Sequence, residues 1–344
     1  MPSCTRGGSL MRMWQVPSFG LNALELVERP SPSPAAGEVL VKVHAVSFNY
    51  RDLLMVKGLY NPRLKLPRIP CSDGAGVVEA AGEGVTAWKP GDRVAGIFMQ
   101  NWIDGPPTPA NVKGALGGDI DGMLAEYVVL RDSGLVALPE HLNFLQAATL
   151  PCAAVTAWNV LKAGNVRAGS TVLVQGTGGV SLFAIQFARA LGARVLGTSS
   201  SAGKLERALS LGLEAGVNYL EQPEWDAWAL KQTGGAGVDL VVEVGGENTL
   251  PQSLRAVRMG GVIAQIGVLS GASAHLSLAL ILHKQVRMQG IYVGSRADFL
   301  EMNAFIRQTG LQPIVEGFPW SESRQVFERM EAQRHFGKLA VTVA

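Results

Sequence analysis

The stretch TVLVQGTGGVSLFAIQFARALGARVLGTSSS, residues 171–201, decides the fold of this chain. An apolar run leads into a glycine cluster, then into apolar residues at helical spacing, and then into a second apolar run. Gly176, Gly178 and Gly179 permit a tight turn and close approach of the backbone to a pyrophosphate. The following helix would present free N–H groups and its positive dipole end to that anion. The pattern therefore predicts a strand–helix–strand unit that binds a dinucleotide, the alternative being a glycine-rich turn without a ligand.

The residues after the second apolar run indicate which dinucleotide binds. A site for NADH usually holds the ribose hydroxyl with an Asp or Glu about 20 residues after the glycines. This chain has the run Thr198–Ser201 there instead, followed by Lys204. A lysine binds a phosphate strongly, whereas a carboxylate would repel it. The sequence therefore favours NADPH, with Ser199, Ser200 and Lys204 facing the 2′-phosphate; the alternative for Lys204 is a solvated helix residue.

Length and composition restrict the class of protein. With 344 residues, 47% of them hydrophobic, the chain is long enough for two domains with separate cores. A net charge of +2 gives no electrostatic footprint for nucleic acid. No apolar run has the length of a membrane span, and residues 1–11, which lack the apolar core of a secretory signal, are expected to be disordered. The three cysteines form no paired framework, so we expect a cytoplasmic protein.

The texture of the sequence changes along the chain. Residues 12–145 contain short apolar runs separated by Gly and Pro, which predicts a small β-rich, barrel-like domain. Residues 146–294 alternate between strand and helix patterns, with strands expected at 171–175, 194–198, 240–244, 261–266 and 287–292. This alternation predicts an α/β fold with a doubly wound parallel sheet. Residues 295–344 carry two helical patterns and a last strand at 338–343, and are expected to return to the first domain.

Six further motifs carry a resemblance to a known family. They are SFNYRD at 47–52, PCSDGAGVVEAAGEGV at 70–85, GDRV at 91–94, DGMLAEY at 121–127, TLPCAAVTAW at 149–158 and RHFGK at 334–338. Together with the glycine-rich stretch, they make nearly everything after residue 11 similar to the medium-chain dehydrogenase/reductase superfamily. The resemblance implies a GroES-like catalytic domain at 12–145 and 295–344 and a Rossmann domain at 146–294. It also implies a cofactor in the cleft between the two and a homodimer formed through the Rossmann domains.

The same resemblance bears on zinc. A catalytic zinc needs about three protein ligands, typically Cys and His with Cys or an acid. This chain has Asn49–Asp52 where zinc-dependent members have their first cysteine, and Cys71–Asp73 in place of Gly-His-Glu; only Cys152 stands at a thiolate position. The 97–118 loop, which would carry four cysteines for a structural zinc, has none. No metal ligands are therefore predicted, the alternative being an improvised site that joins Cys152 to the thiol and carboxylate of the 71–73 segment.

Without a Lewis acid to stabilise an alkoxide, such a site is poor at oxidising simple alcohols. Quinones and α,β-unsaturated carbonyls delocalise the charge of an incoming hydride onto oxygen, so positioning and a few hydrogen-bond donors can suffice. The chain resembles the zinc-free quinone oxidoreductase and enone reductase branch, which implies NADPH-dependent reduction of such a small molecule. The alternatives are an alcohol or aldehyde dehydrogenase of the same superfamily, and a non-catalytic NADPH-binding structural or regulatory protein.

The resemblance also implies the catalytic residues, which are Tyr60, Asn49 and Asp52. Asn49 would reach the nicotinamide ribose or the substrate carbonyl, and for Asn49 and Asp52 the alternative is turn or helix-capping chemistry. Tyr60 would line the substrate cleft, where its phenol donates a hydrogen bond or a proton to the developing enolate. Water is the rival proton donor, and a packed aromatic is the other interpretation of Tyr60.

Part of the predicted cofactor-binding set, Gly245, Gly267 and Val268, follows the carboxyl ends of strands, where open α/β sheets bind ligands. By resemblance, Thr156 contacts the nicotinamide end, Tyr219 lies near the 2′-phosphate and Lys338 faces the cofactor. The full predicted set is Asn49, Thr156, Gly176, Thr177, Gly178, Gly179, Val180, Ser199, Ser200, Lys204, Tyr219, Gly245, Gly267, Val268, Val293, Ser295 and Lys338.

Overall fold

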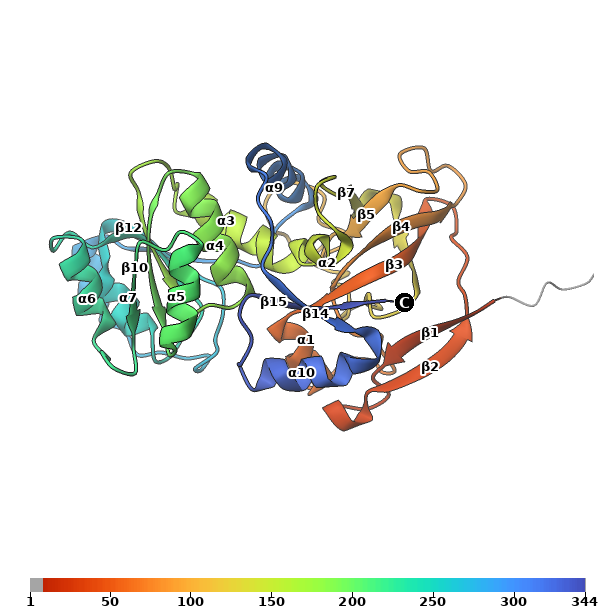
Figure 1. Cartoon of the computed structure of the whole chain (residues 1–344), viewed down its shortest axis with the longest axis horizontal. Helices are drawn as coiled ribbons and strands as arrows, with labels where there is room; N and C mark the ends of the chain where they lie inside the picture. The colour runs from red at the N-terminus through yellow and green to blue at the C-terminus, as the bar shows by residue number, and fades with distance from the viewer. Residues whose placement is uncertain (1–8, 344) are drawn as a thin grey trace, which may run out of the picture. The chain divides into compact units, whose positions relative to one another are not determined.

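The computed structural model describes residues 9–343, which form two compact units (Figure 1). Unit 1 consists of Met1–Cys152 and Ser295–Ala344, and unit 2 of Ala153–Gly294. Sequence patterns predicted domain boundaries after residues 145 and 294. Of the tail expected at residues 1–11, residues 1–8 lie outside the described part, and strand β1 (Leu10–Gln15) includes the last two. Within residues 9–343 no helix is long and apolar enough to cross a membrane.

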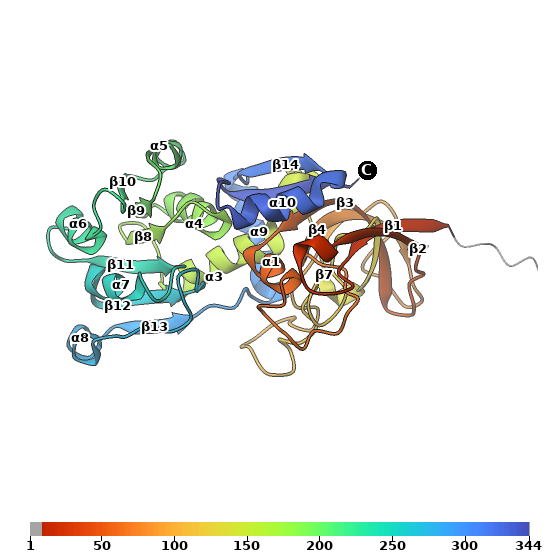
Figure 2. The same cartoon turned by 90° about the horizontal axis from the view of Figure 1, so that it is seen from below.

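Unit 2 contains a six-stranded sheet in which all neighbouring strands are parallel. Its strands are β8 (Thr171–Gln175), β9 (Arg194–Ser199), β10 (Ala215–Asn218), β11 (Val238–Glu243), β12 (Val257–Gln265) and β13 (Arg287–Gly290). Figure 2 shows them in the spatial order β10-β9-β8-β11-β12-β13. This is the doubly wound Rossmann order, which reverses direction between β8 and β11. The predicted α/β class and parallel sheet are therefore confirmed.

Helices cover both faces of the unit 2 sheet. They are α3 (Val155–Ala163), α4 (Gly179–Ala190), α5 (Ala202–Ser210), α6 (Trp225–Gln232), α7 (Leu250–Ala256) and α8 (Leu278–Lys284). In Figure 1, α4 and α5 lie on one face, and α6 and α7 on the other. The central strands are apolar on both faces because helices bury both, and Val172–Val174 and Leu240–Val242 are fully buried.

Unit 1 contains a two-stranded sheet and a seven-stranded sheet. The first pairs β1 with β2 (Glu25–Pro30). The second has the order β14-β15-β3-β4-β5-β7, with β6 also paired to β3. Its strands are β3 (Glu38–Phe48), β4 (Asp73–Ala81), β5 (Arg93–Gly96), β6 (Tyr127–Arg131), β7 (Leu135–Ala137), β14 (Val315–Pro319) and β15 (Lys338–Thr342). Because β15 pairs with β3, the C-terminal segment completes the sheet that the N-terminal segment begins.

Short helices connect the strands of unit 1. They are α1 (Tyr50–Val56), α2 (Phe144–Ala147), α9 (Arg296–Thr309), α10 (Ser323–Glu331), the 3₁₀ turns η1 (Leu21–Ala23), η2 (Asp132–Gly134) and η4 (Trp320–Glu322), and the π-helical turn η3 (Leu150–Ala154). Helix α1 begins directly after β3, and α10 packs near α1 and β15. Phe48 of β3 and Phe327 of α10 meet edge to face with ring centroids 4.8 Å apart, which anchors α10 on the sheet.

Candidate active site

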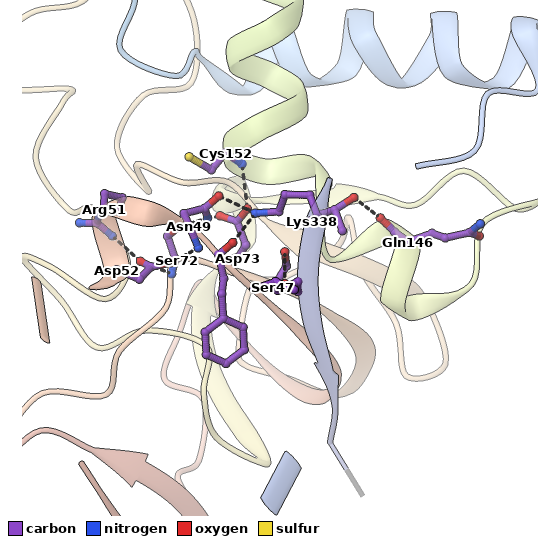
Figure 3. Close-up of polar contacts among 12 residues, drawn as sticks. Ser47, Asn49, Arg51, Asp52, Ser72, Asp73, Gln146, Cys152 and Lys338 are labelled. Carbon is purple, nitrogen blue, oxygen red and sulfur yellow. Dashed lines mark hydrogen bonds and ion pairs between the residues drawn. The ribbon is translucent and has the colours of Figure 1, made fainter. Parts of the chain in front are cut away.

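One end of the unit 1 sheet gathers buried polar side chains (Figure 3). Strand pairing sets Ser47 opposite Asp73 and Phe48 opposite Leu339, so the end of β3 meets the starts of β4 and β15. We call the resulting group the polar cluster; it comprises Asn49, Arg51, Asp52, Ser72, Asp73, Cys152 and Lys338. Its two carboxyl groups and its ammonium group belong to residues that are at most 3% exposed.

Lys338 holds the centre of the polar cluster. Its Nζ donates to the Phe48 carbonyl at 2.7 Å and to Asn49 Oδ1 at 2.5 Å, and lies 4.0 Å from Asp73 Oδ2. Because an ammonium group can only donate, the oxygen of the Asn49 amide must face Lys338. Its nitrogen then faces Ser72 Oγ at 3.3 Å, and Ser72 donates to Asp73 Oδ1 at 2.7 Å. The orientation of the Asn49 amide is thereby fixed.

The Asp52 side chain caps the N-terminus of α1, the helix in whose first turn it lies. Its Oδ2 accepts the Asn49 N–H at 2.9 Å, and its Oδ1 accepts the Ser72 N–H at 3.3 Å and pairs with Arg51 Nη1 at 3.3 Å. The carboxylate is fully buried, so these contacts match the helix-capping alternative for Asp52. The Arg51 guanidinium also lies 5.6 Å from the ring centroid of Tyr60, whose side chain is 44% exposed.

Burial changes the protonation of the cluster. It raises the pKa of Asp52 to about 6, against the opposing effect of Arg51. It likewise raises the pKa of the Asp73 carboxyl, which Lys338 opposes. Burial, together with the nearby carboxylates, also raises the pKa of the Cys71 and Cys152 thiols. Both thiols are therefore protonated and poorly nucleophilic at neutral pH.

Titration of Asp52 is expected to make stability depend on pH. The folded protein keeps a proton on this carboxyl up to pH of about 6, whereas the unfolded chain releases it near pH of about 4. The folded state thus binds more protons in this window. Ionisation of Asp52 therefore lowers the free energy of unfolding by about 3 kcal/mol as the pH rises through it.

The Asp52→Asn variant lacks this titration. As the pH rises from about 4 to about 7, ionisation of Asp52 should lower the free energy of unfolding of wild type by about 3 kcal/mol but should not affect the variant. The stability of the variant relative to wild type should therefore increase by about 3 kcal/mol over this range. Urea denaturation at a series of pH values measures this difference. A difference that stays constant across the series would show that Asp52 does not titrate in this window.

The polar cluster does not fit a zinc ion. Asn49, Ser72, Asp73 and Cys152 supply an amide, a hydroxyl, a carboxyl and a single thiol, and the first three are hydrogen-bonded to one another. The ammonium group of Lys338 lies 4.0 Å from that carboxyl and would repel a cation. In the described part of the chain, no three or more His, Cys, Asp or Glu side chains are grouped to hold a metal. The improvised site of Cys71, Asp73 and Cys152 is therefore not assembled.

The glycine-rich loop of unit 2 leaves open space where a pyrophosphate would lie. Gly176 has φ of +69°, a left-handed conformation that disfavours other residues. Gly178 precedes α4 with an ordinary φ of −78°. An added Cβ at either position would meet no atom of the protein within 4 Å. Helix α4 starts at Gly179 and Val180, and Thr177 is nearly buried between the glycines. The loop thus fits the predicted anion site at a helix N-terminus.

The residues predicted to face a 2′-phosphate lie at or just beyond the carboxyl ends of β9 and β10. Ser199 is buried and its Oγ accepts the Ser201 N–H at 3.2 Å, while Ser200 is exposed. Lys204 lies in the first turn of α5, whose N-terminus Ser201 caps. Tyr219 follows β10, is 39% exposed, and donates its N–H to the Ser199 carbonyl at 3.0 Å. The structure thus brings these predicted residues to one edge of the sheet.

The remaining predicted cofactor residues occupy separate settings. In unit 2, Thr156 is buried in α3, and Gly245, Gly267 and Val268 follow β11 and β12. Val293, also in unit 2, has φ of +57°, and its carbonyl accepts the Asn159 amide at 2.8 Å. Ser295 belongs to unit 1, where it caps α9 and donates its hydroxyl to Asp298 Oδ2 at 2.7 Å. The contacts of Ser295 are therefore those of a helix cap.

Sequence reasoning missed several buried polar residues near both sites. It considered Asp73 only as a metal ligand, and it gave Arg51 and Ser72 no role. It also passed over Gln175 and Glu243, which end β8 and β11 and are 3% and 0% exposed. A detectable signal existed for both, since each is a polar residue that directly follows three apolar residues at the end of its strand.

Two features define the class of this protein. Unit 2 has the strand order and the open glycine-rich loop of dinucleotide-binding domains. Unit 1 has a buried, hydrogen-bonded polar cluster that can stabilise charge. This is the organisation of two-domain dehydrogenases and reductases.

Comparison with known proteins agrees with that class. Residues 35–140 match the alcohol dehydrogenase GroES-like domain family, and residues 179–308 match the zinc-binding dehydrogenase family. A zinc-type alcohol dehydrogenase-like protein of Schizosaccharomyces pombe is 46% identical over 315 residues, which cover 89% of this chain and 91% of that protein. Acryloyl-coenzyme A reductase of Metallosphaera sedula is 29% identical over 327 residues, covering 92% and 96%. The solved quinone oxidoreductase of Coxiella burnetii has a TM-score of 0.79 at 27% identity, covering 98% and 100%.

The chain belongs to the medium-chain dehydrogenase/reductase superfamily and is an oxidoreductase. The predicted fold, a GroES-like domain with a Rossmann-type parallel sheet, is confirmed.

Proposed function

We propose that this protein is a zinc-independent, NADPH-dependent reductase of quinones or α,β-unsaturated carbonyls. The observation that carries the proposal is the buried Lys338 ammonium group, bonded to Asn49 among residues that stand at metal-ligand positions in zinc-dependent relatives. A protonated side chain there supplies positive charge without an open coordination position for an alkoxide. That chemistry favours acceptors that are already electrophilic over simple alcohols.

The choice of NADPH rests on the ends of β9 and β10. Ser199 and Ser200 occupy the place where an NADH-binding domain usually carries a carboxylate, and Lys204 lies in the first turn of α5. Neutral donors and a cation fit a 2′-phosphate, whereas a carboxylate would repel it.

The residues of the chain would divide the work as follows. NADPH, when bound, would supply a hydride, which carries the two electrons of the reduction. The reduced acceptor gains negative charge on its carbonyl oxygen, which the positive charge of Lys338 and the fixed Asn49 amide stabilise. One proton is then needed to complete the reduction. The phenol of Tyr60, exposed beside Arg51, or a water molecule delivers it.

A second candidate is an alcohol dehydrogenase. It is favoured by the family descriptions and by the name of the Schizosaccharomyces pombe relative. The acryloyl-coenzyme A reductase, in contrast, is named for an activated alkene, and the Coxiella burnetii structure for a quinone. A non-catalytic NADPH-binding protein is the third possibility, and measurable turnover would remove it.

One assay separates these functions. Purified protein, dialysed against a strong chelator and checked for metal content, is mixed with NADPH and a panel of quinones and enones. We expect acceptor-dependent loss of NADPH absorbance that matches the untreated sample, a tighter dissociation constant for NADPH than for NADH, and no oxidation of simple alcohols. Stoichiometric zinc whose removal abolishes turnover would establish the alcohol dehydrogenase alternative instead.

We also propose that the protein is a homodimer formed through unit 2. Strand β13 is an edge strand whose four residues are all exposed, and the adjacent helix α8 exposes Leu278 (78%) and Leu282 (72%). An unpaired edge strand beside a helix with exposed leucines favours pairing with a second copy. Sedimentation velocity is expected to give the mass of a dimer, and Leu282→Glu is expected to shift it towards the monomer. A monomeric wild-type protein at micromolar concentration would contradict this proposal.

A further inference from the structure

The buried carboxylate of Glu243, the last residue of β11, receives five hydrogen bonds. Its Oε1 accepts the N–H groups of Gly245 at 2.8 Å and Gly246 at 3.0 Å, and the Thr249 hydroxyl. Its Oε2 accepts Gln175 Nε2 at 2.7 Å and the Ser253 hydroxyl. A carboxylate offers about four lone-pair directions, so its acceptor capacity is full.

No basic side chain pairs with Glu243 in the described part of the chain. A fully buried carboxylate without a cation is costly unless hydrogen bonds replace its hydration. Simple core packing would use an apolar residue at this position. Packing alone therefore does not explain why a carboxylate with five hydrogen-bond donors is buried at this position.

The donors come from segments at the point where the sheet reverses its strand order. Gln175 ends β8, directly before the glycine-rich loop, and its Oε1 accepts the Val244 N–H at 3.2 Å. Its carbonyl accepts the Ser181 hydroxyl of α4 at 2.8 Å. The turn after β11 is also hydrogen-bonded to the loop after β12. The Gly245 carbonyl accepts both the N–H and the hydroxyl of Ser270, at 2.7 and 2.9 Å.

Close packing explains why the turn must be held. An added Cβ at Gly245 would lie 2.2 Å from Thr249 Oγ1, the same hydroxyl that Glu243 binds. At Gly246, with φ of +93°, an added Cβ would lie 2.4 Å from the Gly271 carbonyl. The turn thus has one compact conformation, and Glu243 is the group that bonds both of its N–H donors.

We infer that Glu243 is a positioning residue: it couples the turn at Gly245 and Gly246 to the glycine-rich loop and so holds the dinucleotide site in its binding conformation. This inference rests on the proposed function, since it assumes that unit 2 binds NADPH. Glu243 acts through backbone groups and needs no contact with the cofactor. Its removal should therefore weaken dinucleotide binding far more than it alters the affinity for the acceptor.

The sharpest test exchanges the side chains of Gln175 and Glu243, which are hydrogen-bonded to each other. In Gln175→Glu two carboxylates face each other, and the NADPH dissociation constant is expected to rise at least about tenfold. The double variant Gln175→Glu with Glu243→Gln reverses the direction of the bond between them. An amide oxygen at 243 can still accept the Gly245 and Gly246 N–H groups, so binding is expected to return to within about threefold of wild type. Asp226→Asn, which removes another buried unit 2 carboxylate paired with Arg255, serves as the control and should leave the dissociation constant unchanged.

A second measurement does not depend on the cofactor. Hydrogen exchange of residues 244–250 in the ligand-free protein is expected to be slow in wild type, at least about tenfold faster in Gln175→Glu, and slow again in the exchanged pair. Failure of wild type to bind any dinucleotide would overturn the proposed function before a variant is made. Wild-type binding combined with an unaffected Gln175→Glu, or with no rescue in the exchanged pair, would overturn the role of Glu243 alone.

Discussion

Replacing Lys338 by Met is expected to lower the free energy of unfolding by about 3–5 kcal/mol, the usual effect of breaking a buried ion pair. The change removes a buried cation and leaves the fully buried Asp73 carboxylate facing Asn49 and Ser72 without a counter-charge. Burial already raises the pKa of Asp73, and Lys338 is the principal group that opposes this. The measurement is urea denaturation at pH 7, followed by tryptophan fluorescence.

Two further variants make this result specific. Lys338→Met combined with Asp73→Asn removes both charges and is expected to recover most of the loss. Lys57 pairs with Glu331 on the surface, with side chains 35% and 46% exposed, so Lys57→Met should cost less than about 1 kcal/mol. A double variant as unstable as Lys338→Met alone would show that the ammonium group does not balance Asp73. Turnover should fall in Lys338→Met at temperatures where the variant remains folded.

Replacing Gly178 by Ala is expected to raise the NADPH dissociation constant by about 10- to 100-fold, or about 1.4–2.7 kcal/mol. The added methyl group would occupy space that no protein atom fills and that a pyrophosphate would approach. The φ of −78° is ordinary for alanine, so the backbone is not strained. Isothermal titration with NADPH measures the effect.

The same variant supplies its own control. Because the methyl group meets nothing within 4 Å, the melting temperature of the ligand-free protein should match wild type. The increase in melting temperature on adding NADPH should shrink. Gly176 cannot serve for this comparison, since its φ of +69° would strain any replacement. Unchanged NADPH affinity in Gly178→Ala would mean that this loop does not hold the pyrophosphate.

The doubly wound sheet could be predicted because its signals are local. The glycine-rich turn and the apolar runs of β8, β9 and β11 lie in continuous stretches of sequence. Strand β10 was absent from the predicted strands for the same reason, since among its four residues only Val217 is a buried hydrophobic. It is held by pairing with β9, which no local pattern reports.

The polar cluster could not be assembled from the sequence alone. Lys338 and Asn49 are 289 positions apart and meet only because β15 pairs with β3. The resemblance to a known family named both residues as site candidates, but it assigned Lys338 to the cofactor and did not anticipate its hydrogen bond with Asn49. Buried hydrogen-bond networks depend on strand register, and a register is not written in any single stretch of sequence.

The pairing of β15 with β3 also bears on the order of folding during synthesis. Residues 153–294 form a unit of their own between the two segments of unit 1, so the ribosome releases all of them before β15 emerges. The later unit in the sequence can therefore fold first. Until β15 is synthesised, the β3 edge of the N-terminal sheet lacks its partner strand, and the Asp73 carboxylate lacks the ammonium group of Lys338. A chaperone that binds the nascent chain would therefore be needed most during this interval, while the edge of β3 is unpaired.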